Sequence, residues 1–276
     1  MVCCVTPTDA LAALRERVRA AGPLLVAFSG GADSALVAAV AAQELGPAAV
    51  AVTAVSASLP AAERAKARAF ARERGIRHVE VCTDELDRPD YVANGGDRCF
   101  HCKSALLDAL VPLAELAGAS IALGTNLDDL GDHRPGQRAA ASRGAVAPLV
   151  EAGLGKCAVR EVSALLGLST AGKPSAACLS SRVAYGDPVT PQVLRRIEVA
   201  EAAVHALGFG ICRVRAHAGG TIARLELPAD RLDEGAARRG ELDAALRDAG
   251  FTFAALDLRG FASGRMNVLL GLPSAP

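Results

Sequence analysis

Two groups of residues in this sequence have the types and spacing that chemistry requires. The first is the run Ser-Gly-Gly-Ala-Asp-Ser over residues 29–34, which lies between two apolar segments. The second is a set of cysteines: Cys99 and Cys102 are separated by two residues, and Cys178 lies among small and polar residues. Glycine-rich loops bind anions, and thiolates bind metals or act as nucleophiles. The sequence therefore predicts a phosphate site and a sulfur or metal site.

The loop over residues 29–34 is predicted to hold phosphate. Residues 24–28 are predicted as a short buried strand and residues 35–45 as a helix, so the loop joins a strand to a helix N-terminus. Glycines let backbone N–H groups approach an anion, and the helix N-terminus adds unpaired donors and partial positive charge. The lysine of the Walker loop is absent, so chemistry built on it is not indicated. The alternative is a glycine turn in which Asp33 or Ser34 only caps the helix.

The elements that position this loop alternate between strands and helices. Apolar runs predict buried strands over residues 24–28, 48–55, 77–82 and 120–123. The segments between them predict helices over residues 35–45, 60–75 and 100–116, after a first helix capped by Thr8. This alternation predicts an α/β fold with a doubly wound parallel sheet. Ligands bind at the carboxyl ends of such strands, so we expect Thr53 and the run Gly124-Thr125-Asn126 to line one nucleotide site with the loop.

The second part of the chain has a different pattern. Thr190 is predicted to cap a helix over residues 191–207, followed by two strands over 210–216 and 221–227. A helix or helix pair over 228–249 and a strand over 251–258 complete a smaller α+β domain. We therefore expect an ATP-binding domain over residues 1–172 and a substrate or oligomerisation domain over residues 173–276.

Composition limits the partners and the compartment. Lys and Arg together number 30, as do Asp and Glu, so the net charge is zero and nothing global attracts a nucleic acid. A small anionic substrate suits this balance better. No apolar run is long enough for a membrane helix and the N-terminus does not resemble a signal peptide. We therefore expect a cytoplasmic protein whose cysteines are not structural disulfides.

The cysteine pair has three possible roles. The spacing of Cys99 and Cys102 lets two thiolates meet one metal or one iron-sulfur cluster, and Arg98 and Lys103 favour the thiolate forms. The second role is a redox dithiol, which is disfavoured because the pair does not lie at a thioredoxin-like corner between a strand and a helix. The third is structural, with the two cysteines only filling the start of a helix. A metal site needs another ligand. Cys178 is the candidate, and its position among small polar residues also suits a nucleophile or sulfur donor.

Acidic residues after the fourth predicted strand form a further candidate site. Asp128, Asp129 and Asp132 lie within five residues, and hard carboxylate ligands could hold Mg²⁺ together with ATP phosphates. A solvated loop explains each residue equally well.

Charged pairs in the second half are also candidates. Arg213 and Arg215 are two apart on a predicted strand and share a face, where paired guanidinium groups can clamp phosphate. A solvated strand face is the alternative. Glu198 and Glu201 share a helix face; they could bind a divalent cation, but facing water is the default for such carboxylates.

Five segments together resemble the LarE family over nearly the whole chain, and the loop resembles the PP-loop of ATP pyrophosphatases. The segments are the loop over 29–34, Arg-Cys-Phe-His-Cys-Lys over 98–103, Gly-Thr-Asn-Leu-Asp-Asp-Leu-Gly-Asp over 124–132, Lys-Pro-x-x-Ala-Cys-Leu-x-Ser-Arg over 173–182, and Tyr-Gly over 185–186. Members are ATP-dependent sulfur transferases of nickel-pincer nucleotide cofactor biosynthesis. The resemblance implies that each carboxylate of pyridinium-3,5-biscarboxylic acid mononucleotide is adenylated, with release of pyrophosphate, and that sulfur then replaces AMP.

The resemblance implies roles for the candidate residues. The loop residues Ser29, Gly30, Gly31, Asp33 and Ser34 would bind ATP, with Asp33 on Mg²⁺, and the arginine pair would bind the substrate phosphate. The family has two sulfur sources: a sacrificed cysteine, here Cys178, which becomes dehydroalanine, or a [4Fe-4S] cluster held by three cysteines. The presence of Cys99 and Cys102 favours the cluster, because sacrifice needs only Cys178.

Other classes remain as alternatives. An amide-forming synthetase or a tRNA-thiolating enzyme would share the loop, but the first needs no cysteines and the second usually has a basic surface. A non-catalytic nucleotide- or cluster-binding scaffold would not need the complete loop. We further expect a small-molecule nucleotide substrate, a homo-oligomer, and a sulfur-donor protein as a candidate partner.

Overall fold

The computed structural model describes residues 6–131, 143–174, 177–262 and 264–271. The chain divides into two compact units. The first comprises Met1–Ser56, Ala61–Asp84 and Cys99–Ala176, and the second comprises Ala57–Pro60, Glu85–Arg98 and Ala177–Pro276. The second unit therefore includes two short segments from the half of the sequence that was expected to form the ATP-binding domain.

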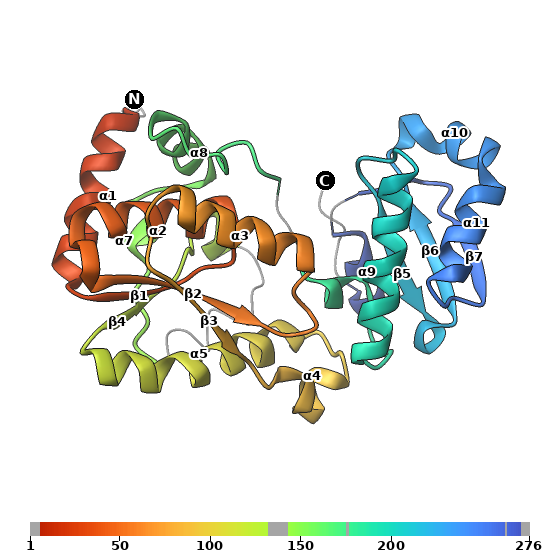
Figure 1. Cartoon of the computed structure of the whole chain (residues 1–276), viewed down its shortest axis with the longest axis horizontal. Coiled ribbons are helices and arrows are strands. Elements are labelled where there is room, and N and C mark those ends of the chain that lie inside the picture. Colours follow the sequence, from red (N-terminus) through yellow and green to blue (C-terminus); the bar gives the residue numbers. More distant parts are fainter. Residues whose placement is uncertain (1–5, 132–142, 175–176, 263, 272–276) are drawn as a thin grey trace. The chain divides into compact units, whose positions relative to one another are not determined.

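A four-stranded parallel sheet organises the first unit (Figure 1). Its strands are β1 (Leu24–Ala27), β2 (Ala49–Val55), β3 (His78–Cys82) and β4 (Ser120–Ala122), in the order β3-β2-β1-β4. Every pairing is parallel, and the interior strand β1 is hydrogen-bonded to both β2 and β4. The predicted parallel α/β sheet is confirmed.

Helices cover both faces of this sheet. They are α1 (Pro7–Ala21), α2 (Ala32–Leu45), α3 (Ala61–Glu73), α5 (Arg98–Ala117), α7 (Pro148–Glu151) and α8 (Lys156–Leu165). Because side chains alternate across a strand, Leu24 and Val26 of β1 join one buried cluster with α1, α2, α3 and α8. Leu25 and Ala27 join another with α5, which lies across the sheet from α1, α2 and α3 in Figure 1.

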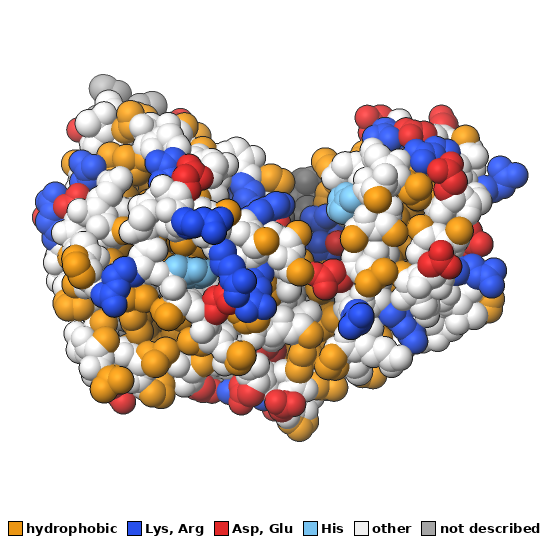
Figure 2. Space-filling view, in the orientation of Figure 1, with side chains coloured by type: hydrophobic (Ala, Val, Ile, Leu, Met, Phe, Trp, Pro, Cys, Tyr) orange, Lys and Arg blue, Asp and Glu red, His pale blue; other side chains and the backbone are white. Residues whose placement is uncertain are grey.

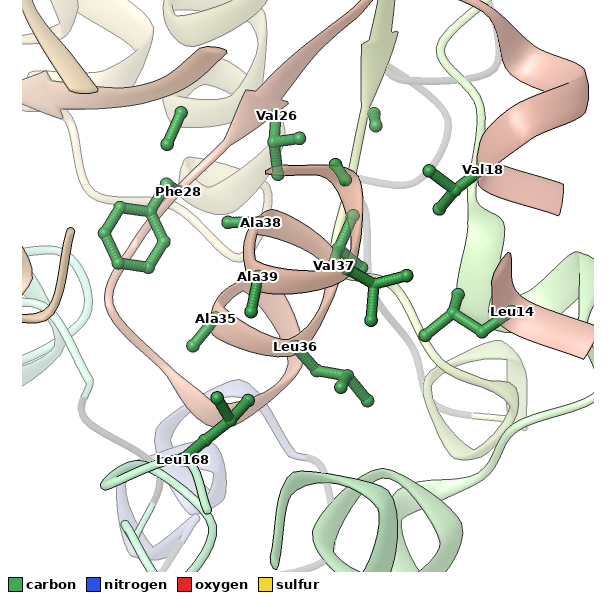
Figure 3. Close-up of a cluster of buried hydrophobic side chains, with 14 of the residues drawn as sticks. Leu14, Val18, Val26, Phe28, Ala35, Leu36, Val37, Ala38, Ala39 and Leu168 are labelled. Carbon is green, nitrogen blue, oxygen red and sulfur yellow. The ribbon is translucent and has the colours of Figure 1, made fainter. Parts of the chain in front are cut away.

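The buried helix α2 forms the centre of the larger cluster. Figure 3 shows α2 between Val26 and Phe28 on one side and Leu14 and Val18 of α1 on the other. All residues from Ser34 to Ala41 are buried, and many of them are alanines. Small side chains let α2 lie close to the sheet on one side and to α1 on the other, which fixes the helix that follows the glycine loop.

The second unit has a three-stranded mixed sheet in the order β5-β6-β7 (Figure 1). Strand β5 (Arg213–His217) pairs antiparallel with β6 (Ile222–Glu226), and β6 pairs parallel with β7 (Phe253–Leu256). The helices of this unit are α4 (Pro89–Val92), α9 (Pro191–Ala206), α10 (Leu232–Ala237) and α11 (Arg239–Asp248). Thr190 caps α9 by accepting a hydrogen bond from Val193 N, as predicted.

The predicted helix starts need three corrections. Thr6, not Thr8, caps α1 because Pro7 occupies the first helical position and Thr6 Oγ1 accepts from Asp9 N. Helix α5 begins at Arg98, two residues earlier than predicted. Helix α2 begins at Ala32 rather than at residue 35. Asp33 therefore lies in the first turn of α2.

Charge is mixed on the face of the molecule drawn in Figure 2. On the face shown in Figure 2, Lys and Arg side chains lie among Asp and Glu side chains on each unit. None of the described helices is both long and apolar enough to span a membrane.

Candidate active site

The glycine loop joins the end of β1 to the start of α2. Gly30 has φ +72°, a left-handed conformation that L side chains rarely adopt. Gly31 is the extended residue before the helix, with φ −79° and ψ 164°, and no side chain of the described residues caps α2 there. The first-turn N–H groups of a 14-residue helix are thus left for an anion.

Two serines brace the loop from within. Ser34 Oγ accepts from Ser29 N at 3.2 Å and donates to the carbonyl oxygen of Gly31 at 3.2 Å. Because that proton is used, the hydroxyl of Ser29 is the donor in the 3.1 Å contact between the two serine oxygens. These contacts hold the loop in one conformation before any ligand binds.

Thr53 of β2 fixes the entry to the loop. Its hydroxyl donates to the carbonyl oxygen of Phe28 at 2.8 Å, and His78 Nε2 lies 2.8 Å from the same hydroxyl oxygen. Since the hydroxyl proton is committed to Phe28, His78 Nε2 is the donor. Burial lowers the pKa of His78. The negative charge of Glu80 raises it and the positive charge of Arg68 lowers it, but burial is the largest cause. Thr53 therefore links strand β2 to the residue that precedes the loop.

Asn126 joins the end of β4 to Asp33. Its Nδ2 donates to Asp33 Oδ1 at 2.9 Å, and its Oδ1 accepts from the backbone N–H groups of Asp128 and Asp129 at 3.0 and 3.3 Å. Asp33 Oδ2 has no hydrogen-bond donor among the residues that the structure describes. One carboxylate oxygen is thus oriented by the amide, and the other is left for a cation such as Mg²⁺.

The aspartates after Asn126 are used by the fold in the described structure. Asp129 Oδ2 accepts from Asn126 N at 3.1 Å. Asp128 Oδ2 accepts from the backbone N–H of Lys156, the first residue of α8. Asp132 lies outside the described residues. The two described carboxylates therefore stabilise the turn and the start of α8.

Gly124 lies against the first turn of α2. A Cβ atom on Gly124 would lie 2.7 Å from Ser34 N and 2.8 Å from Ser34 Cα, both of which are backbone atoms. Neither can move without shifting the loop. The sequence analysis predicted that Gly124, Thr125 and Asn126 bind the nucleotide. In the structure Gly124 lies against the backbone of Asp33 and Ser34, at the end of the glycine loop.

We expect Gly124→Ala to displace the loop. Forcing a methyl group into this contact should lower stability by about 1–3 kcal/mol and weaken binding of a non-hydrolysable ATP analogue by roughly tenfold, measured by calorimetry. Gly240→Ala is the matched control, because nothing lies within 4 Å of a Cβ there. Equal ATP-analogue affinity in the two variants would show that the contact is unimportant.

The cysteines lie in both units. Near the start of α5, Cys99 is exposed and Cys102 is half-buried, and because they are three residues apart they lie on one helix face. Half-buried Cys178 precedes the 3₁₀ turn Leu179–Arg182 in the second unit, and its carbonyl oxygen accepts from Ser181 Oγ and Arg182. Within the described residues, no three His, Cys, Asp or Glu residues group closely enough to hold a metal.

Buried ion pairs surround the arginine pair of the second unit. Arg215 donates to Glu226 Oε2 from Nε and Nη2 at 3.0 and 2.9 Å, and from Nη1 to the carbonyl oxygen of Ser181. Arg213 donates to the carbonyl oxygen of Cys212 and lies 5.1 Å from the ring centre of Phe261. Arg215 is thus committed to a carboxylate, whereas Arg213 has no carboxylate partner among the described residues.

The default assignment of Glu201 to solvent was wrong. Glu201 is buried, pairs with Arg182 at 3.1 Å, and accepts from Val214 N at 3.1 Å. Glu198, on the same helix, is half-buried. Nearby Cys212, which was assigned no role, has a pKa raised to about 12, mainly by burial; it is an inert core thiol.

Two functional candidates were missed from sequence. Lys173 Nζ lies 2.7 Å from the carbonyl oxygen of Gly30, and Arg182 is the buried partner of Glu201. Both belong to the segment over 173–182, which the sequence analysis used only for the family resemblance and for Cys178. Their charge within a stretch of small residues was the available signal.

The sheet, the Ser-Gly-Gly-x-Asp-Ser loop and the uncapped helix behind it define an ATP-using PP-loop enzyme. A sequence profile of the family described as asparagine synthase matches residues 10–94, which include this loop. The pyridinium-3,5-bisthiocarboxylic acid mononucleotide synthase of Lactiplantibacillus plantarum is 35% identical over 259 residues, 93% of this chain and 92% of that one. This chain belongs to the LarE family and is an ATP-dependent sulfurtransferase, whose PP-loop uses ATP with Mg²⁺.

Two further relatives have no assigned activity. The uncharacterized protein slr1717 of Synechocystis sp. is 44% identical over 249 residues, 89% of this chain and 92% of its own. The uncharacterized protein MJ0830 of Methanocaldococcus jannaschii is 25% identical over 173 residues, 62% of this chain and 67% of its own.

Proposed function

We propose that this enzyme adenylates the carboxylates of pyridinium-3,5-biscarboxylic acid mononucleotide and replaces AMP by sulfur. The observation that carries the proposal is the 35% identity, across 92% of its length, to the synthase whose name states the thiocarboxylate product. In the first step a carboxylate oxygen attacks the α-phosphorus of ATP, and the bond to the leaving pyrophosphate breaks. In the second step a sulfur nucleophile attacks the activated carbon, and AMP leaves with the electron pair of the C–O bond.

The loop supplies the groups that adenylation needs. The uncapped first turn of α2 would bind phosphate oxygens, and Asp33 would hold Mg²⁺ through the oxygen that Asn126 leaves open. When bound, Mg²⁺ would neutralise charge on the pyrophosphate as it leaves. Asn126 keeps the carboxylate oriented by its hydrogen bond, so the ligand is preorganised.

Arg213 supports a site for the substrate phosphate. Its pKa is lowered first by burial and next by repulsion from Arg182. The negative charge of Glu201 raises the pKa, and repulsion from Arg215 lowers it further. A half-buried cation among other cations gains when an anion binds. We propose that Arg213 donates to the phosphate of the mononucleotide. Arg215 adds positive charge from the same strand face while it keeps its pairing with Glu226.

For the sulfur step we propose that Cys99, Cys102 and Cys178 hold a [4Fe-4S] cluster. Exposed and half-buried thiols one helical turn apart suit such ligation, and three thiolates leave one iron open. When bound, the cluster would carry the sulfur that replaces AMP. The competing candidate is Cys178 alone as a sacrificed sulfur donor, which its half-buried position equally permits.

The setting of the enzyme is also proposed. The zero net charge supports a small nucleotide substrate rather than a nucleic acid. We propose that the enzyme works in the cytoplasm as a homo-oligomer, that a sulfur-donor protein renews its sulfur, and that the nucleotide and substrate functions divide near residue 172.

Anaerobic reconstitution with iron and sulfide tests the cluster. We expect the broad charge-transfer absorption of an iron-thiolate centre, which is lost in Cys99→Ala and Cys178→Ala and kept in Cys157→Ala. Cys157 is an exposed cysteine of α8 and serves as the control. Mass spectrometry after turnover can give the opposing outcome. Dehydroalanine at residue 178 in a protein without bound iron would contradict the cluster and show that Cys178 is the sacrificed sulfur donor.

Pyrophosphate release tests the adenylation step separately. With ATP, Mg²⁺ and the biscarboxylate mononucleotide, the enzyme should release pyrophosphate even when all three cysteines are alanine, because sulfur enters afterwards. If no pyrophosphate appears with wild-type enzyme, this mononucleotide is not the substrate.

A further inference from the structure

The PP-loop has a lysine from a distant part of the chain. Lys173 lies 143 residues after Gly30, yet its Nζ donates to the carbonyl oxygen of Gly30 at 2.7 Å. The same Nζ lies 2.6 Å from Glu63 Oε2. Only 16% of the Lys173 side chain is exposed, and the same holds for Glu63. A long, flexible side chain is therefore held in one place beside the loop.

Helix α3 provides the support for this arrangement. Ala67 of α3 lies directly against Gly30, since a Cβ there would meet Ala67 Cβ at 3.2 Å. Glu63 is one helical turn before Ala67 and so faces the same way. Burial alone would raise the pKa of Glu63, but the hydrogen bonds and positive charges of Lys173 and Lys66 together outweigh burial and lower it. Glu63 is therefore a carboxylate at neutral pH and a lasting partner for an ammonium group.

An ammonium group in this position matches what the loop lacks. The loop has no lysine of its own, and the pyrophosphate part of ATP carries more charge than backbone N–H groups and one Mg²⁺ neutralise. Lysine is a point charge with three donors, of which the described residues take two, at Gly30 and Glu63. The third is available to a phosphate oxygen, and the bond to Gly30 can be exchanged for another.

We propose that Lys173 binds the β- and γ-phosphates of ATP at the PP-loop, and that Glu63 is the positioning residue that holds its ammonium group there. In the ligand-free state the ammonium group donates to Gly30. When the anion binds, that hydrogen bond is exchanged for one to a phosphate oxygen, while the ion pair with Glu63 remains. The inference rests on ATP use by the loop and deepens the proposed adenylation.

Calorimetry with two probes tests this inference. Mg²⁺-pyrophosphate carries the phosphates that Lys173 should contact, whereas AMP lacks them. We expect Lys173→Gln to weaken Mg²⁺-pyrophosphate binding about 10- to 100-fold and AMP binding less than about twofold. Lys173→Arg, which keeps the charge, should recover most of the loss. Glu63→Gln should weaken pyrophosphate binding by a smaller factor, about three- to tenfold, again without an effect on AMP.

Lys66→Gln is the matched control. Lys66 pairs with the other oxygen of Glu63, at 2.9 Å, but its side chain is 64% exposed. Its loss should leave both affinities unchanged. If Lys173 only stabilises the fold, Lys173→Gln will weaken the binding of pyrophosphate and of AMP together, or will weaken neither, and the inference is overturned. If Lys173→Gln does not fold, the same comparison of the two affinities in Glu63→Gln decides the matter. Because neither probe needs the carboxylate substrate, an error about that substrate leaves this result unaffected.

Discussion

Asp33→Asn should reduce ATP-dependent pyrophosphate release by at least about 100-fold, the size of effect seen when one charge-stabilising group is removed from an active site. The reason is the division of labour between the two oxygens of Asp33: Oδ1 accepts from Asn126 at 2.9 Å, and Oδ2 is left for a cation. Asparagine keeps the shape and an acceptor for Asn126 but removes the charge that attracts Mg²⁺. A coupled assay for pyrophosphate, run over a Mg²⁺ titration, measures the loss.

The Mg²⁺ titration separates metal binding from other causes. If Asp33 is the ligand, higher Mg²⁺ should partly restore the rate of Asp33→Asn, and the thermal midpoint should change little, because Asp33 is only half-buried. Asp90→Asn, an exposed carboxylate of α4, is the control and should behave as wild type. An Asp33→Asn enzyme with full activity would remove Asp33 from the catalytic groups.

Glu226→Ala should lower the free energy of unfolding of the second unit by about 3–5 kcal/mol, the usual cost of breaking a buried ion pair from one side. Glu226 is completely buried and accepts from both Arg215 and Arg224, at 2.9 Å in each case. Without it the two guanidinium groups lose the carboxylate that they share, and Asp257 is the carboxylate partner that Arg224 keeps among the described residues. The repulsion between the two guanidinium groups then adds to the cost of keeping them away from water without a carboxylate partner.

Tyrosine fluorescence offers a way to follow this unit by itself. The chain has no tryptophan and two tyrosines, Tyr91 and Tyr185, and both belong to the second unit. Urea unfolding followed by tyrosine emission therefore reports on that unit. Glu234→Ala is the control: its side chain is 40% exposed and its pairs with Arg231 and Arg238 should contribute less than about 1 kcal/mol. Equal losses in the two variants would contradict the predicted difference.

Much of the fold was predictable because its signals are local. Apolar runs bounded by Gly and Pro located all four strands of the first unit, and Thr190 followed by a proline located the start of α9. Helix starts were less predictable. Asp33 and Ser34 were assigned to the loop, yet they lie in the first turn of α2, because Gly31 takes the extended conformation and ends the loop three residues earlier than predicted.

The candidate site was predictable in part. The loop and the run Gly124-Thr125-Asn126 were expected at one edge of the sheet, and the hydrogen bond between Asn126 and Asp33 joins them. The partners of individual charges were not predictable. Glu201 was assigned to water, since spacing alone cannot show that Arg182 and Val214 N face it from elsewhere in the second unit.

The sequence by itself determined that a phosphate-binding loop follows the first strand of a parallel sheet, and that cysteines suited to sulfur chemistry occur in the same chain. These properties depend on residues close together in sequence, whose periodicity and backbone preferences act locally. Only the tertiary structure decided which charged groups meet. Lys173 contacts Gly30 across 143 residues, and Asn126 contacts Asp33 across 93. Such contacts depend on strand order and helix packing, which bring distant segments to one edge of the sheet.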